Sequence, residues 1–151
     1  MKRWVFLIIV LLLVSCQGKK TSTALFEEGQ KLFAQQKYDE AIAKYEEAIK
    51  LLPNSAVGYN LLGMAYRFKY NAERDPSSRE KEIDAFKKSI ECDDTYWVAY
   101  VNLGATYYYI GKKKEAAPLF EKALKLYPEN PEKEELEKMI KEGRAEEQDN
   151  K

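Results

Sequence analysis

The sequence predicts an all-α protein in which antiparallel helix pairs stack side by side into an α-solenoid. Two observations lead to this fold class. Similar residues recur at intervals of 34 residues, or of 41 where seven extra residues intervene. Within each interval the large apolar residues are spaced three and four positions apart, which places them on one face of a helix. Because one helix pair cannot bury such a face alone, neighbouring pairs must stack to complete a core.

The repeat is visible in the spacing of glycine, alanine, aromatic and proline residues. Gly29 and Gly63 are 34 positions apart, and Gly63 and Gly104 are 41 apart. A longer set of residues is followed by residues of the same or similar type 75 positions later. Ala41, Tyr45, Ala48, Leu51 and Pro53 correspond in this way to Ala116, Phe120, Ala123, Leu126 and Pro128. Between the two sets lie Glu82, Phe86, Ser89, Cys92 and Asp94, 41 residues after the first and 34 before the second.

These residues and spacings resemble the tetratricopeptide repeat (TPR) family. The resemblance implies three helix pairs over residues 22–130, with repeats at 22–55, 56–96 and 97–130. Repeat three carries nearly the complete signature, whereas repeat two departs from it with Glu82 and Asp94 where alanine and proline are expected. The small residues of the signature let the two helices of a pair approach closely.

Capping residues support the boundaries. Ser55 and the pair Asp75-Pro76 are suited to start helices. We expect residues 131–143 to form a C-terminal capping helix that ends near Gly143, followed by a frayed tail at 144–151. The insertion, about Tyr70 to Ser77, is expected to project as a loop, either as a tolerated surface loop or as a secondary contact site.

The first twenty residues predict a targeting signal and a lipid anchor. Lys2 and Arg3 precede an unbroken apolar run from Trp4 to Val14, which is too short to span a bilayer but fits a signal peptide. The stretch LVSC that ends at Cys16 resembles a bacterial lipobox. That resemblance implies removal of residues 1–15, a diacylglyceryl thioether on Cys16 and a lipidated tether at 16–21. An uncleaved anchor, or an ordinary signal that leaves Cys16 as a free thiol, are the alternatives.

The lipid on Cys16 predicts a location. Two or three acyl chains hold a protein stably on a membrane, so we expect the mature chain in the bacterial cell envelope. Gln17 follows the lipidated cysteine in place of the aspartate that retains lipoproteins in some inner membranes. This favours the periplasmic side of the outer membrane.

Composition excludes several function classes. The 25 basic and 25 acidic residues balance, so there is no basic excess for nucleic acid. The chain has no histidine, which removes His-based catalysis and the usual zinc sites. Gly-rich phosphate loops and CxxC motifs are missing from the sequence as well. We therefore expect no enzyme, small-molecule substrate, metal or cofactor; a carboxylate-based glycan-cleaving activity is the remaining catalytic alternative.

The TPR resemblance implies that the first helices of successive repeats line a concave groove for a protein partner. Matched by position, the groove residues are Phe26, Gln30, Phe33, Asn60, Met64, Arg67, Phe68, Val98, Val101, Asn102, Ala105, Tyr108 and Tyr109. This largely apolar and aromatic set suits a helix or an extended peptide whose backbone the amides hold. Alternatively, some of these residues pack against neighbouring repeats or the capping helix.

The chemistry of one known TPR site is missing. Chaperone-binding members grip a terminal carboxylate with lysine, arginine and asparagine residues in the three repeats. The matching positions here are Phe26, Gln30, Leu61, Val98 and Asn102. The resemblance therefore does not extend to this carboxylate clamp.

Together these features predict a membrane-anchored adaptor lipoprotein that binds a protein of the envelope. The alternative is a structural lipoprotein that self-associates, because repeat proteins with exposed apolar ends stack into homo-oligomers.

Overall fold

The computed structural model describes residues 21–149. Within them the chain forms helices only: α2 (Ser22–Ala34), α3 (Tyr38–Leu51), α4 (Ala56–Glu73), α5 (Pro76–Cys92), α6 (Trp97–Tyr109), α7 (Lys113–Leu126) and α8 (Lys133–Asp149). The predicted all-α solenoid is confirmed. The proposed signal peptide at 1–15 and the lipidation site Cys16 lie outside the described residues.

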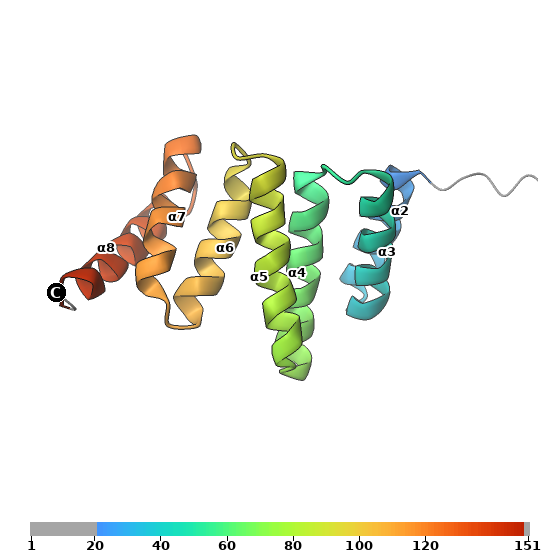
Figure 1. Ribbon diagram of the computed structural model, residues 1–151, viewed down its shortest axis with the longest axis horizontal. Coiled ribbons are helices and arrows are strands. Elements are labelled where there is room, and N and C mark those ends of the chain that lie inside the picture. The colour runs from blue at the N-terminus through green and yellow to red at the C-terminus, as the bar shows by residue number, and fades with distance from the viewer. Residues whose placement is uncertain (1–20, 150–151) are drawn as a thin grey trace, which may run out of the picture.

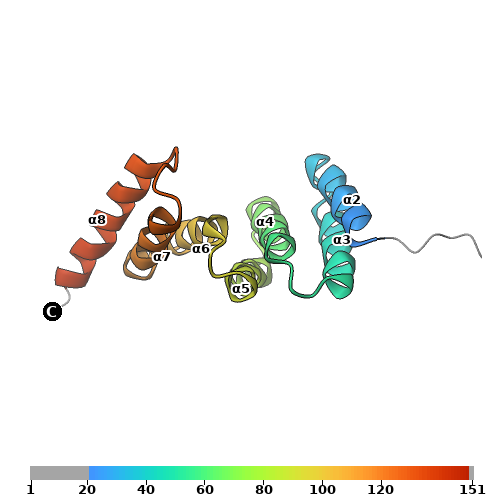
Figure 2. The ribbon, with the colours of Figure 1, turned by 90° about the horizontal axis from the view of Figure 1, so that it is seen from above.

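The helices stand side by side in chain order along the long axis of the molecule (Figure 1). Seen from above, α2 and α4 lie on one side of the row, and α3 and α5 lie on the other (Figure 2). The first helices α2 and α4 thus share a face; we call this face, together with the part of α6 that contacts α4, the first-helix face. The pairs α2–α3, α4–α5 and α6–α7 are followed by α8, which packs on α7.

Two of the expected helix starts have the capping contacts that the sequence predicts. The Ser55 hydroxyl accepts a hydrogen bond from the Gly58 amide, 3.0 Å away, at the start of α4. Asp75 accepts one from the Ser77 amide at 3.1 Å, and Pro76 occupies the first position of α5. Both contacts satisfy amides that the helix itself leaves without partners.

The insertion in repeat two does not project as a loop. It lengthens both helices of the pair, so α4 has 18 residues where α2 and α6 each have 13. Only Arg74 and Asp75 separate α4 from α5. The lower ends of α4 and α5 accordingly extend beyond the neighbouring helices (Figure 1). The run YNAERDPSSRE contains one proline, and it stands at the first turn of α5, where proline is compatible with a helix.

Close packing within a pair depends on the signature glycines. A Cβ at Gly63 would lie 2.6 Å from Cε1 of Phe86, which is fully buried. Gly29 faces Tyr45 and Gly104 faces Phe120 in the same way. The recurring glycine and aromatic positions of the sequence are therefore a single contact that is repeated in each pair.

The apolar core of the described chain has two clusters. The first, from α3, α4 and α5, contains Ala41, Ile42, Tyr45, Ile49, Leu62, Ala65, Tyr66 and Ala85. The second, from α7 and α8, contains Ala116, Phe120, Leu136 and Met139. The junction between repeats two and three, where α4 and α5 meet α6, is crossed by polar contacts that are described below.

The capping helix is longer than expected. Gly143 does not end α8, which continues to Asp149 through part of the expected tail. Gly143 is buried inside the helix, and a Cβ there would lie 2.9 Å from the carbonyl carbon of Lys113 and closer still to its oxygen. The glycine therefore serves a close approach of two backbones instead of a helix end. None of the helices between residues 21 and 149 is long and apolar enough to cross a bilayer.

Candidate functional site

The predicted groove residues all lie on α2, α4 and α6, but they differ in exposure. Asn60 is buried, with 4% of its surface exposed. Gln30, Phe68 and Tyr109 are exposed. The other nine groove residues are partly buried, namely Phe26, Phe33, Met64, Arg67, Val98, Val101, Asn102, Ala105 and Tyr108.

Four of these residues meet at one cavity on the first-helix face. The cavity has a volume of about 380 Å³ and is lined by Met64, Trp97, Val98, Val101, Asn102, Asn130, Pro131 and Glu132. Its walls are α4, α6 and the turn that leads into α8, and we call it the α4–α6 cavity. The size is in the range of small ligand pockets, and the lining is mainly apolar. It is the candidate binding site for an apolar segment.

Half of this lining was not predicted from the sequence. Trp97 precedes the matched groove positions of α6, and its ring stacks on Tyr127 at 4.9 Å between centroids. The turn before α8 contains Asn130, Pro131 and Glu132. For this region the sequence pattern predicts only a capping helix and no part of a binding site. No sequence signal gives the position of this turn, because it depends on how α8 packs on α7.

The side-chain amides of Asn60 and Asn102 are hydrogen-bonded within the chain, whereas Nδ2 of the cavity-lining Asn130 is buried without a hydrogen-bond partner among the described residues. The Asn102 side chain donates to the Asn60 side-chain oxygen at 2.9 Å. Arg67 donates from Nη1 to the Asn102 side-chain oxygen at 3.0 Å and from Nη2 to its backbone oxygen at 2.6 Å. Both of these amide oxygens are used as acceptors, so the polar group that the lining leaves without a partner within residues 21–149 is Nδ2 of Asn130, and the rest of the contact offered to a ligand is mainly apolar.

One of the two departures of repeat two from the TPR signature, Glu82 in place of alanine, is a buried carboxylate with hydrogen-bond partners. Glu82 is fully buried, yet three side chains donate to it. Arg67 Nε donates to Oε1 at 2.8 Å, the Thr106 hydroxyl donates to Oε1 at 2.5 Å, and Arg79 Nη1 donates to Oε2. Arg67 Nη2 also donates a hydrogen bond to the Thr106 hydroxyl oxygen at 2.8 Å. We call Arg67, Arg79, Glu82 and Thr106 the Glu82 network; it joins α4 and α5 to α6 across the junction of repeats two and three.

The predicted residues on α2 lie apart from the α4–α6 cavity. Phe33 contacts Phe68 edge to face, with ring centroids 5.1 Å apart, and Tyr38 in the same manner at 5.7 Å. The Phe26 ring packs where a Cβ of Gly58 would be, so it fills the space between α2 and α4. These aromatic side chains therefore contribute to the packing of repeats one and two.

Tyr108 is covered by the capping helix. Its hydroxyl donates to Glu142 at 2.6 Å, and Lys113 donates to the same carboxylate oxygen at 2.8 Å. The hydrogen bond to Glu142 raises the pKa of Tyr108 and the pKa of Lys113. In turn, the hydrogen bonds from Lys113 and Tyr108 lower the pKa of Glu142. This contact links α8 to α6 and α7.

These shifts predict a pH dependence of stability. Because the pKa of Glu142 is lowered in the folded state, its contribution is present above the ordinary value of 4.5 and is lost as the pH falls through the folded pKa. Denaturant unfolding should therefore show Glu142→Gln less stable than the wild type near neutral pH, with a difference that shrinks below pH 4.5. Glu137→Gln, at an exposed position of the same helix, is the control and should show no such change. A constant difference would contradict the assigned contact.

Two observations concern the metal-binding and thiol chemistry of the described residues. Between residues 21 and 149, no three His, Cys, Asp or Glu side chains are grouped as they would be around a metal ion. Cys92 is a half-buried free thiol in the same range.

Comparison with known proteins identifies the repeats. Sequence models described as "TPR repeat" and "Tetratricopeptide repeat" match residues 29–67 and 97–130. The chain contains tetratricopeptide repeats. The stretch that the two TPR models leave between them, 68–96, holds the insertion and both departures from the signature, Glu82 and Asp94.

Relatives and solved structures agree with this assignment. The chain is 32% identical to the Hsp70-Hsp90 organizing protein of Triticum aestivum over 106 residues, which cover 70% of this chain but only 17% of that protein. The first TPR domain of human RPAP3 superposes with a TM-score of 0.71 at 27% identity, covering 87% of this chain and 98% of that one. The first TPR of Spaghetti (RPAP3) bound to the HSP90 peptide SRMEEVD gives a TM-score of 0.68 at 29% identity, with coverages of 80% and 91%.

Proposed function

We propose that this chain is a TPR adaptor that binds an apolar segment of a protein partner in the α4–α6 cavity. The observation that carries the proposal is the cavity of about 380 Å³ on the first-helix face, where Met64, Val98 and Val101 meet Trp97. Peptide binding by a similar TPR domain, the one bound to the HSP90 peptide, supports a protein ligand. Two of the positions that form the carboxylate clamp in chaperone-binding TPR domains are Val98 and Asn102, and both line this cavity. We therefore expect an apolar anchor there instead of a terminal carboxylate.

The cavity can be tested by placing a charge in it. We expect Val98→Asp to reduce partner capture by at least about tenfold, because an unpaired carboxylate would be desolvated against the apolar segment. Capture is measured in cells with a photocrosslinking residue at Met64, followed by identification of the crosslinked protein. Val57→Asp is the matched control, since Val57 is on α4, is 52% exposed and does not line the cavity. Equal capture by both variants would remove the cavity from the proposal.

We further propose that the adaptor is held in the bacterial cell envelope by a lipid on Cys16, on the periplasmic side of the outer membrane. The LVSC stretch and Gln17 support this placement. Cys16→Ala should abolish the incorporation of labelled fatty acid and release the protein from the membrane fraction. Membrane retention of an uncleaved Cys16→Ala chain would favour a transmembrane anchor, and density-gradient separation of the two membranes tests the placement.

A further inference from the structure

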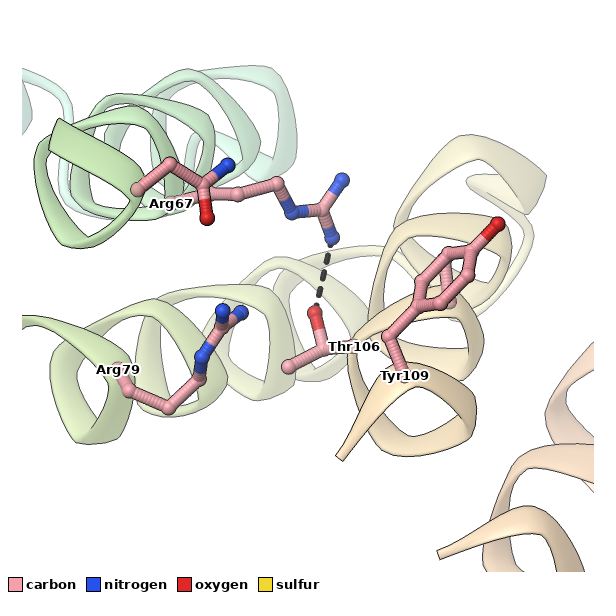
Figure 3. A pocket seen from close by; sticks show the side chains of 6 residues that line it. Arg67, Arg79, Thr106 and Tyr109 are labelled. Carbon is pink, nitrogen blue, oxygen red and sulfur yellow. Dashed lines mark hydrogen bonds between the residues drawn. The ribbon is translucent and has the colours of Figure 1, made fainter. Parts of the chain in front are cut away.

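A second cavity lies between α4, α5 and α6, and the insertion in repeat two supplies one residue of its lining, Asn71. This cavity has a volume of about 290 Å³ and is lined by Arg67, Asn71, Arg79, Ala105, Thr106 and Tyr109. Asn71 lies in the extended end of α4, and Arg79 lies in the first turns of α5. Figure 3 shows Arg67 reaching from α4 toward Thr106 and Tyr109 of α6, with Arg79 beside it. We call this cavity the arginine pocket.

The charges around the arginine pocket do not balance. Arg67 and Arg79 supply two positive charges, and both pair with the single carboxylate of Glu82. The other lining residues, Asn71, Ala105, Thr106 and Tyr109, are uncharged at neutral pH. Glu82, which lies outside the lining, neutralises one of the two charges, and the lining holds no acidic residue, so one positive charge is left without a counter-charge among these groups.

Arg79 also keeps unused hydrogen-bonding capacity. Within residues 21–149 its Nε–H is buried and has no acceptor. Its guanidinium donates from Nη1 to Glu82 and lies 4.0 Å from the centre of the Tyr70 ring, which fixes its plane. A guanidinium has five N–H donors in a fixed fork that matches the geometry of a carboxylate. At the rim, Tyr109 is 73% exposed, so the pocket is open to a ligand.

We propose that the arginine pocket binds a carboxylate of the partner segment whose apolar part occupies the α4–α6 cavity. This proposal deepens the proposed adaptor function and rests on it for the identity of the ligand. A singly charged carboxylate matches the excess of one positive charge, whereas a phosphate group carries about −1.5 to −2 and would face the buried Glu82 with surplus negative charge. The volume suits one side chain or chain terminus but is small for a cofactor.

The pocket differs from the carboxylate clamp of chaperone-binding TPR domains. The clamp positions correspond to Phe26, Gln30, Leu61, Val98 and Asn102, and none of them lines the arginine pocket. Asn71 is supplied by the insertion, and Arg79 pairs with Glu82, the residue that replaces the signature alanine. The insertion and the Glu82 departure of repeat two thus take part in one arrangement.

The proposal is tested with small probes on the full-length protein in a neutral detergent. Arginine is labelled with ¹⁵N, and the Nε–H signals are followed by NMR. The probes are N-acetylglutamic acid α-amide for a side-chain carboxylate, N-acetylglycine for a chain terminus, N-acetylglutamine amide as the neutral match, and inorganic phosphate. We expect a saturable shift of the Arg67 and Arg79 signals with one or both carboxylates, at a Kd on the order of 1–10 mM because the probes are small. Arg144, which pairs with Glu121, is an internal control.

A charge series at Asn71 separates binding from stability. Asn71 is exposed, so its substitution is expected to leave the fold intact. Asn71→Asp should weaken carboxylate binding by about three- to tenfold, and Asn71→Lys should strengthen it by a similar factor. Asn54→Asp makes the same change in net charge at an exposed position outside the pocket and should leave the Kd unchanged.

The outcomes distinguish this proposal from the adaptor function. A carboxylate shift that follows the Asn71 series supports the pocket, and the two carboxylate probes show whether a side chain or a terminus is preferred. No shift, an equal shift with the glutamine probe, or a stronger response to phosphate would overturn it. Because the probes need no partner protein, failure here leaves the Val98→Asp test of the α4–α6 cavity unaffected.

Discussion

Replacing Glu82 with alanine should destabilise the protein by about 3 kcal/mol, although alanine is the signature residue at this position of the repeat. Glu82 is fully buried and accepts hydrogen bonds from Arg67, Arg79 and Thr106. Its removal leaves two guanidinium groups close together without a counter-charge. Their side chains are 22% and 20% exposed, so water compensates in part, and we expect the lower end of the range for a broken buried pair. Denaturant unfolding measures the change.

Two controls show whether the loss comes from the buried charge. Glu91→Ala removes an exposed carboxylate of the same helix, paired with Lys88 at 2.5 Å, and should cost less than about 1 kcal/mol. The triple variant Arg67→Met, Arg79→Met and Glu82→Ala removes the charges together and should recover most of the stability, since apolar replacement of a buried ion network is often neutral. A Glu82→Ala protein as stable as the wild type would contradict the role given to the Glu82 network.

Gly143→Ala is expected to detach the capping helix from α7, with a loss of about 1–3 kcal/mol. In an isolated helix this substitution would stabilise by about 1 kcal/mol, because alanine has the higher helix propensity. Here the new Cβ would meet the backbone carbonyl of Lys113 and the Cβ of Ala117, and neither can rotate away. This clash outweighs the gain in helix propensity, so the substitution is expected to destabilise the protein. Faster proteolysis within residues 133–149, together with denaturant unfolding, would measure the change.

A second substitution on α8 provides the comparison. Lys141→Ala introduces the same side chain at an exposed position of that helix and should change the stability by less than about 0.5 kcal/mol. If Gly143→Ala proved as stable as Lys141→Ala, α8 would have room to shift, and the close approach to Lys113 would not be needed for docking.

The sequence by itself determined the helix pairs and their order. The 34-residue spacing of Gly29 and Gly63, and the 41-residue spacing of Gly63 and Gly104, predicted a close approach of the two helices in each pair, which the structure shows as a glycine-to-aromatic contact. Ser55 and Asp75 correctly predicted two helix starts. These features are local or repeat from one pair to the next, so periodicity and capping chemistry record them directly.

The tertiary structure decided what the irregular residues do. Glu82, noticed only as a departure from the signature, is joined to Arg67 and Thr106, which are 15 and 24 positions away. Gly143 resembled a helix end in the sequence but lies inside α8, because the choice depends on the backbone of Lys113. The turn before α8 forms a wall of the α4–α6 cavity because of the way α8 packs on α7, which the sequence pattern does not specify. A repeat pattern specifies which face of a helix is buried, but the side chain that meets a given residue is set by the distance and angle between helices.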